Sequence, residues 1–432
     1  MNYKKKAITG AIGFALIAVF SSFVYMAVTM ISMNICELHG FTVAEFSLFF
    51  SAYGAGTIVS NYMLGLLMKK LGLKKLARFG ILPSIISTIV LILADNIILL
   101  SIGAFIIGFF VGLVSIATYS VFVGAWFNRG RGMMISLLGG VTSIANMIFA
   151  PVMANVIETS GTVTAVLGLG IVLTVVTIIG NFMVCNLPSV YGAEMVDITK
   201  EKKSKSAKDD SQAAETQEKP YDIQMPASKL LRHPATIIAL LIPFLGIVGT
   251  LLYMNYHVYV YESMGLDYTT AALFVSIASG ATIIFSPLFG IACDKLGIKA
   301  GIIIFSGTVG ITRILSPILG GYAGAIIFAL FNGMSSYAFY VGGIVFPELF
   351  GQKNNATLNG WFGALSGLSS IVAAPLAVQL IAAANQSYDL VIYVSGALFL
   401  LSIVGIIYLM SDSTKKSLIK MDQKYLQKIN NQ

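Results

Sequence analysis

Charged residues are scarce in this sequence. Asp, Glu, Lys and Arg together make up 11% of its 432 residues, whereas hydrophobic residues make up 57%. Soluble globular domains carry about a quarter charged residues, so this composition excludes a water-soluble fold. The mean hydropathy of +0.85 indicates that lipid surrounds most of the chain.

Cysteine and histidine are also rare, with three residues each. The cysteines stand at unrelated spacings, which excludes a disulfide framework and a metal site. The histidines are far apart, and the sequence contains no HExxH motif, nucleophile elbow or phosphate-binding loop. We therefore expect no enzyme activity, no metal and no other cofactor. The cysteines, interpreted as apolar packing residues, are Cys36, Cys185 and Cys293.

Long apolar runs dominate the rest of the chain. Each can cross ~30 Å of hydrocarbon as a helix. The first follows a basic start and has no small-residue cleavage site, so it is interpreted as a retained span rather than a signal peptide. The pattern predicts twelve spans, at 7–33, 43–68, 77–95, 97–125, 132–157, 163–186, 235–261, 268–292, 300–318, 320–347, 354–384 and 388–410.

The positions of the basic residues support this topology. A net charge of +8 could indicate a nucleic-acid partner, but 26 of the 27 Lys and Arg residues fall in alternate gaps between spans. That segregation predicts a cytoplasmic location for those gaps and for both termini. We therefore expect an integral protein of the cell membrane that binds no nucleic acid. The exception is Arg313, inside the ninth span.

A repeated segment suggests that the chain has two related halves. The sequence Gly-Leu-Leu-Met-Lys-Lys-Leu-Gly at 65–72 returns as Gly-Ile-Ala-Cys-Asp-Lys-Leu-Gly at 290–297, an offset of 225 residues. Parallel repeats of this kind are typical of transporters. The prediction is a bundle over 1–186, a polar linker over 187–234, a second bundle over 235–410 and a tail over 411–432.

Residues 290–299 match the Gly-x-x-x-Asp-Lys/Arg-x-Gly-x-Lys/Arg loop, and on this motif the chain resembles the major facilitator superfamily. Trp126-Phe127 and Phe350-Gly351 are similar to its oxalate/formate exchangers and monocarboxylate carriers. The resemblance implies an all-α membrane protein with twelve transmembrane helices in two six-helix bundles related by pseudo-two-fold symmetry. It implies a monomeric secondary active transporter for a monocarboxylate or related organic anion, coupled to protons or to exchange.

In the resembled fold, spans one, four, seven and ten line a central cavity. The alternative for small residues on these helices is close helix packing, which we favour for the glycines, such as Gly108 and Gly112. For the polar side chains on these helices, a role in substrate binding and a role in packing both stay open. The candidate substrate-binding residues are Tyr25, Tyr119, Asn146, Tyr253, Tyr256, Asn332, Ser336 and Tyr340.

Two residues are candidate charged groups within the spans. Arg313 lies 14 residues after Lys299, roughly 21 Å along a helix, so a snorkelling or lipid-facing position is favoured over substrate binding. His257 could couple transport to protons, but a place at the outer helix end without that role is favoured. The resembled branch carries an arginine where this chain has Ser286, and a span-eleven lysine that is missing from 356–384.

Without a buried cation, the expectation of an anionic substrate weakens. The alternative is a carrier of a neutral, zwitterionic or amphipathic molecule, and a non-transporting membrane sensor ranks lower. By resemblance, Asp294 approaches the start of span five near Arg131 and holds the cytoplasmic side closed. The predicted gating residues are Gly65, Gly72, Arg131, Gly290, Asp294 and Gly297.

Overall fold

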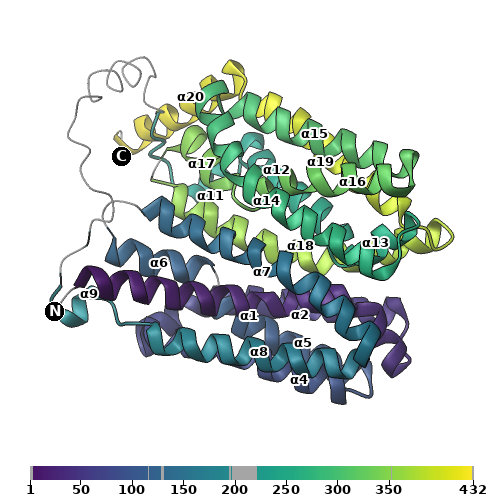
Figure 1. Cartoon of the computed structure of the whole chain (residues 1–432). Helices are drawn as coiled ribbons and strands as arrows, with labels where there is room; N and C mark the ends of the chain where they lie inside the picture. The colour runs from purple at the N-terminus through teal and green to yellow at the C-terminus, as the bar shows by residue number, and fades with distance from the viewer. Residues whose placement is uncertain are drawn as a thin grey trace, which may run out of the picture.

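The computed structural model describes residues 3–114, 116–127, 131–193, 196, 221–351 and 353–430, almost entirely as helices (Figure 1). The first half comprises α1 (Tyr3–His39), α2 (Val43–Leu71), α3 (Leu73–Arg78), η1 (Phe79–Ile81), α4 (Leu82–Leu93), α5 (Ile97–Leu113), α6 (Ile116–Trp126), α7 (Arg131–Ser160), α8 (Thr162–Met183) and α9 (Pro188–Tyr191). The second half comprises α11 (Ala227–Leu230), α12 (Pro234–Met254), α13 (His257–Ser263), α14 (Tyr268–Leu296), α15 (Ile298–Leu319), α16 (Gly321–Asn332), η2 (Gly333–Phe339), α17 (Gly342–Phe350), α18 (Asn355–Ala383), α19 (Asp389–Leu409) and α20 (Asp412–Asn430).

Within the described residues, eleven helical segments are long and apolar enough to cross a membrane, and α5 is a shorter apolar helix. Together they occupy the twelve predicted spans, which confirms the all-α membrane fold. Span four is divided between α5 and α6, span seven between α12 and α13, and span ten into α16, η2 and α17. Such interruptions release backbone polar groups, which a membrane protein tolerates where they are buried in protein or line a cavity.

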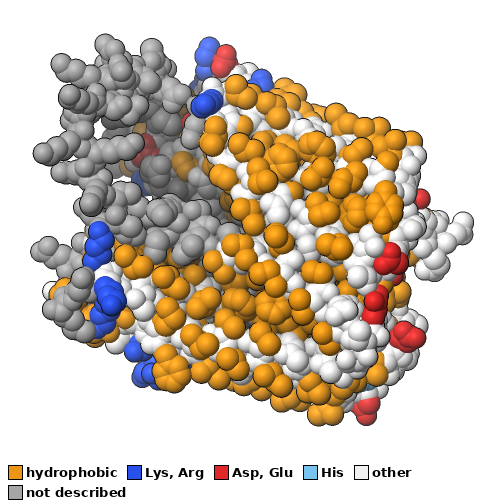
Figure 2. Space-filling view, viewed as in Figure 1, with side chains coloured by type: hydrophobic (Ala, Val, Ile, Leu, Met, Phe, Trp, Pro, Cys, Tyr) orange, Lys and Arg blue, Asp and Glu red, His pale blue; other side chains and the backbone are white. Residues whose placement is uncertain are grey.

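The two ends of the molecule differ in charge. Figure 2 shows Lys and Arg at the end that carries the N-terminus, acidic side chains at the opposite end, and a broad hydrophobic surface between them. At the acidic end, helix caps fix two helix starts. Thr42 and Glu45 form a capping box at α2. Asp267 caps α14, and hydrogen bonds from Thr270 hold the pKa of this carboxyl below its usual range.

The loop glycines of the repeat adopt matching backbone conformations. Gly72 has φ +76° and ψ 155°, and Gly297 has φ +86° and ψ 153°. Each ends one long helix and precedes the next, α2 to α3 and α14 to α15. Residues other than glycine rarely adopt positive φ, so both positions require glycine for the same turn. The sequence repeat is therefore a structural repeat at these two loops.

Helices α2 and α5 pack closely through glycines. A Cβ added at Gly108 would overlap the carbonyl oxygen of Tyr53, and one at Gly112 would overlap the hydroxyl of Ser60. This is the close helix approach that small residues permit in membranes. The packing role favoured for these two glycines is confirmed.

We expect Gly108→Ala to lower the stability of the first bundle by about 1–3 kcal/mol, because a well-packed contact must open to admit the methyl group. Thermal unfolding of the purified protein in detergent measures this change. The matched control is Gly168→Ala in α8, where an added Cβ meets nothing within 4 Å. Equal unfolding temperatures for the two variants would contradict the packing role of Gly108.

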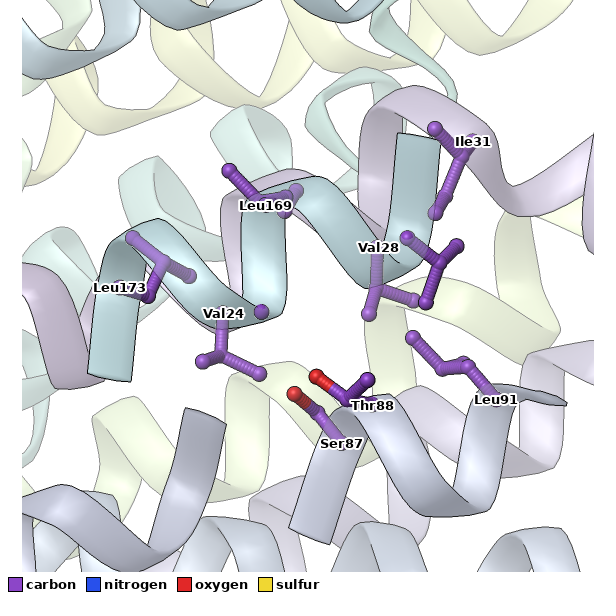
Figure 3. Close-up of a pocket in the computed structure, with 11 residues that line it drawn as sticks. Val24, Val28, Ile31, Ser87, Thr88, Leu91, Leu169 and Leu173 are labelled. Carbon is purple, nitrogen blue, oxygen red and sulfur yellow. The ribbon is translucent and has the colours of Figure 1, made fainter. Parts of the chain in front are cut away.

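A small cavity lies between α1, α4 and α8 (Figure 3). Its volume is about 20 Å³, and its wall is mostly aliphatic, including Val24, Leu169 and Leu173. The Ser87 and Thr88 hydroxyls donate to the Ser84 carbonyl of their own helix. A space of this size holds about one water molecule, so it is a packing gap rather than a substrate site.

Candidate functional site

Arg313 lies in the interior of the second bundle. Its side chain is 1% exposed, which corrects the expected lipid-facing position. The physical reason is the register of α15, where Phe305, Val309 and Arg313 follow one another at four-residue spacing on the buried face. A lipid-facing position would require Arg313 to leave that face.

The guanidinium group of Arg313 has neutral partners. It donates to the Asn332 Oδ1 at 3.0 Å, to the Ser395 Oγ at 2.5 Å and to the Gly249 carbonyl at 3.3 Å. Among the described residues, no Asp or Glu pairs with it, and its Nε has no partner. A buried charge inside a membrane is costly and is functional by default.

Two aromatic rings complete the environment of Arg313. The guanidinium carbon lies 4.6 Å from the ring centroids of both Tyr253 and Phe399. Cation–π contacts of this kind become stronger when water is excluded. Arg313 is thus held by α12, α16 and α19 together, at a place where two of the predicted substrate-binding residues, Tyr253 and Asn332, meet.

Arg313 fixes the orientation of Asn332. The Asn332 Oδ1 accepts hydrogen bonds from Arg313 and from the Tyr253 hydroxyl, the latter at 2.5 Å. Because a guanidinium group has only donors, the amide oxygen must face it and the amide NH₂ must turn away. Arg313 therefore holds the neutral Asn332 side chain, on span ten, with its NH₂ group directed away from the guanidinium and able to donate a hydrogen bond.

Three hydroxyl groups gather in the same bundle, nearer the end that carries both termini. Ser336 Oγ lies 3.1 Å from both Ser286 Oγ and Tyr340 Oη. All three side chains are partly exposed. Ser286, at the position where the resembled branch carries an arginine, joins Ser336 and Tyr340, which were predicted from the sequence. The cluster can donate and accept hydrogen bonds and carries no charge.

A separate contact joins the two bundles. The Tyr25 hydroxyl donates to the Asn255 Oδ1 at 2.5 Å, between α1 and the break in span seven. Tyr25 also packs against Tyr53, with ring centroids 4.7 Å apart. Asn255 is fully buried and its Nδ2 has no partner in the described part of the chain. Sequence reasoning missed Asn255, although an amide inside an apolar run was a usable signal.

Further contacts between the bundles lie toward the acidic end. The hydroxyls of Tyr259 and Tyr268 both approach the Asn34 Oδ1, at 3.2 and 3.3 Å. At the rim, Thr269 Oγ1 donates to Glu158 Oε1 at 2.5 Å. The Tyr25 and Asn34 contacts thus join α1 to the second bundle from its middle to its acidic end, and the Thr269–Glu158 bond joins α14 to α7.

His257 is buried at the start of α13. It is 5% exposed, and its ring lies 5.2 Å from that of Tyr253. Its two ring nitrogens, and the hydroxyls of the neighbouring Tyr256 and Tyr261, have no hydrogen-bond partner among the described residues. Unsatisfied buried polar groups are rare and call for a ligand, water or a functional explanation.

Other predicted residues do not join these groups. Tyr119 is buried in the first bundle against Phe14, with ring centroids 5.8 Å apart. Trp126, part of the motif behind the branch resemblance, donates its indole N–H to the Asn186 carbonyl at 3.0 Å. It therefore ties the end of α6 to the chain after α8.

The predicted inner gate is only partly described. Gly72 and Gly297 form the matching turns, and Gly290 borders open space. Gly65 belongs to α2, but its surroundings and the side chains of Arg131, Asn146 and Asp294 lie outside the described part of the structure. The contact between Asp294 and the start of span five stays a prediction.

Comparison with known proteins gives a family and a fold. The Major Facilitator Superfamily model matches residues 14–344 and 257–429. The Protein TsgA homolog of Buchnera aphidicola subsp. Acyrthosiphon pisum is 29% identical over 140 residues, 32% of this chain and 36% of the relative. That of Citrobacter koseri is 29% identical over 132 residues, 30% of this chain and 33% of the relative. The match thus spans about a third of these curated relatives.

Solved structures share the whole architecture. A D-xylose-proton symporter superposes with a TM-score of 0.68 at 12% identity, over 96% of this chain and 99% of that one. The nucleoside transporter NupG gives the same TM-score at 13% identity, over 95% and 100% of the two chains. At such low identity the likeness establishes the fold alone.

Proposed function

Because the chain belongs to the major facilitator superfamily, we propose that it is a secondary active transporter that moves a small organic anion, such as a monocarboxylate, by alternating access. Coupling is to protons or to exchange of a second solute. The transporter works as a monomer in the cell membrane. The segregation of its basic residues supports a cytoplasmic location for both termini.

The observation that supports an anionic substrate is that Arg313 is buried and has no carboxylate partner among the described residues. Taking such a charge out of water is costly unless other groups compensate. Its neutral partners supply part of that compensation, and an anion near the Asn332 amide and the Tyr253 ring would supply more. Arg313 is thereby a positioning residue, because it acts through Asn332, whose amide oxygen accepts its hydrogen bond.

Alternating access needs contacts between the bundles that form in one state and break in another. The Tyr25–Asn255 bond and the Tyr259–Asn34 bond are suited to this role, because each crosses from span one to span seven. We infer that they close the outer side in the described conformation. The anion then enters or leaves from the end that carries both termini.

A neutral polar solute is the second candidate. It is favoured by the hydroxyl cluster of Ser286, Ser336 and Tyr340, which suits a polyhydroxylated molecule. The two structural neighbours carry a sugar and nucleosides according to their names. Ser286 in place of an arginine also fits this alternative.

Ligand-induced stabilisation separates the two candidates. Thermal unfolding of the purified protein is measured against a panel of carboxylates, sugars and nucleosides. A bound ligand at a hundred times its dissociation constant stabilises by about 2.7 kcal/mol. We expect a carboxylate to raise the unfolding temperature of the wild type but not of Arg313→Met. Stabilisation by neutral solutes alone would favour the second candidate.

A further inference from the structure

Helix α20 carries a row of lysines on one face. Lys416, Lys420, Lys424 and Lys428 are all exposed and recur every four residues. Side chains at this spacing lie above one another on a helix. The only acidic residues of α20 are Asp412, in its first turn, and Asp422, which is fully buried. The lysine row is therefore a strip of positive charge without acidic partners on its own helix.

The opposite face of α20 is anchored to the second bundle. Thr414, Leu418 and Asp422 are 4%, 1% and 0% exposed. They precede the lysines 416, 420 and 424 by two residues each, which is about 200° around a helix. The anchored face and the lysine row thus point in opposite directions.

Asp422 receives hydrogen bonds from the chain segment that leads into span seven. Its carboxylate accepts from the backbone N–H of Met225 at 2.7 Å, that of Gln224 at 3.2 Å and the Tyr221 hydroxyl at 3.0 Å. Backbone donors to a buried carboxylate are among the stronger hydrogen bonds in proteins. These contacts fix the rotation of α20 about its own axis.

Lys415, which is not part of the lysine row, attaches α20 to the second bundle. Lys415 pairs with Glu348 of α17, Nζ to Oε1, at 2.9 Å. The four lysines of the row have no ion pair with any described residue. They are therefore available to an external partner, whereas Lys415 serves the attachment of α20.

The position of α20 suggests what that partner is. Helix α20 begins at Asp412, three residues after α19 ends at Leu409, so it starts beside the end of the last span. Figure 1 draws it across the end that carries both termini, and Figure 2 shows basic side chains there. Lysine clusters directly beside a transmembrane helix, or on an amphipathic helix, attract anionic lipids of the cytoplasmic leaflet.

We propose that the lysine row of α20 is a docking surface for the headgroups of anionic phospholipids. The row is rigid because Asp422 holds the helix, so its four ammonium groups are presented together along one face of α20. This inference goes beyond the transport function and does not depend on the substrate.

Hydrogen exchange of the α20 backbone tests the proposal. The full chain is placed in nanodiscs of phosphatidylcholine, or of phosphatidylcholine with a third phosphatidylglycerol. We expect several-fold slower exchange over 412–430 with the anionic lipid, and loss of this difference in K416Q/K420Q/K424Q/K428Q and in high salt. The corresponding quadruple Lys→Arg variant, which keeps the charge, should behave as the wild type.

Two results would overturn the proposal. One is an undiminished effect of phosphatidylglycerol on the quadruple Gln variant. The other is equal protection by soluble polyglutamate in phosphatidylcholine nanodiscs, which would identify an acidic protein as the partner. All four substituted lysines are exposed, so thermal unfolding in neutral lipid should match the wild type and confirm that the variant is folded.

Discussion

Replacing Arg313 by lysine is expected to lower the uptake of an anionic substrate by about 10- to 100-fold. A lysine keeps the charge but cannot present the planar fork that reaches both Asn332 and Ser395. A hydrogen bond to a charged group contributes about 1.5–3 kcal/mol, and each 1.4 kcal/mol is tenfold in affinity. Without the guanidinium group, the Asn332 amide oxygen keeps only the hydrogen bond from Tyr253, so its orientation is held less firmly.

Arg313→Met separates function from stability. Replacing a buried charge by an apolar side chain of similar length is often neutral or stabilising, so we expect this variant to fold and to lose anion uptake. Ser402→Ala is the control, because Ser402 makes a buried hydrogen bond to Ser306 in the same bundle and reaches the surroundings of Arg313 through the backbone carbonyl of Phe399, not through a side chain that contacts Arg313. Wild-type anion uptake by Arg313→Met would show that Arg313 has no part in substrate binding.

Removing the bond between Tyr25 and Asn255 is expected to favour the outward-open state. A hydrogen bond contributes about 1 kcal/mol net, so Tyr25→Phe should shift the equilibrium about fivefold. Cys36 is a native reporter, because it is 6% exposed, lies near the outer end of α1 and is close to Tyr256 of the other bundle. In a background of Cys185→Ser and Cys293→Ser, a membrane-impermeant maleimide should label Cys36 about five times faster in the variant.

The matched control for this labelling is Tyr53→Phe. Tyr53 packs against Tyr25, but its hydroxyl makes no hydrogen bond to the other bundle among the described residues. Its removal should leave the labelling rate unchanged. Equal acceleration in both variants would mean that loss of polarity, rather than the bond between the bundles, opens the outer side.

The fold was predictable from the sequence because a membrane imposes simple rules. Span length, basic residues in alternate gaps and the repeat of the loop at 65–72 each depend on local sequence. The interruptions in spans four, seven and ten were not predicted, because hydropathy averages over a window and does not register one changed backbone angle. The turn at Tyr256, with φ −131° and ψ 32°, is such a case.

The candidate site was predictable in part. Four residues were selected as polar residues on the expected cavity helices. The structure places Tyr253 and Asn332 next to Arg313, and Ser336 and Tyr340 in the hydroxyl cluster. Arg313 was misjudged because its distance from the cytoplasmic end was considered without its helical register. Contacts such as Tyr25 with Asn255 link residues 230 positions apart, which no local pattern reports.

Uptake of labelled solutes into proteoliposomes tests the central claim most directly. The purified wild type is reconstituted and supplied with a labelled monocarboxylate, sugar or nucleoside, under a pH gradient or with unlabelled solute inside. We predict that the wild type accumulates more labelled carboxylate than protein-free liposomes and more than proteoliposomes that contain the Arg313→Lys variant. Accumulation of a neutral solute alone, at the same rate in wild type and Arg313→Lys, would contradict this prediction.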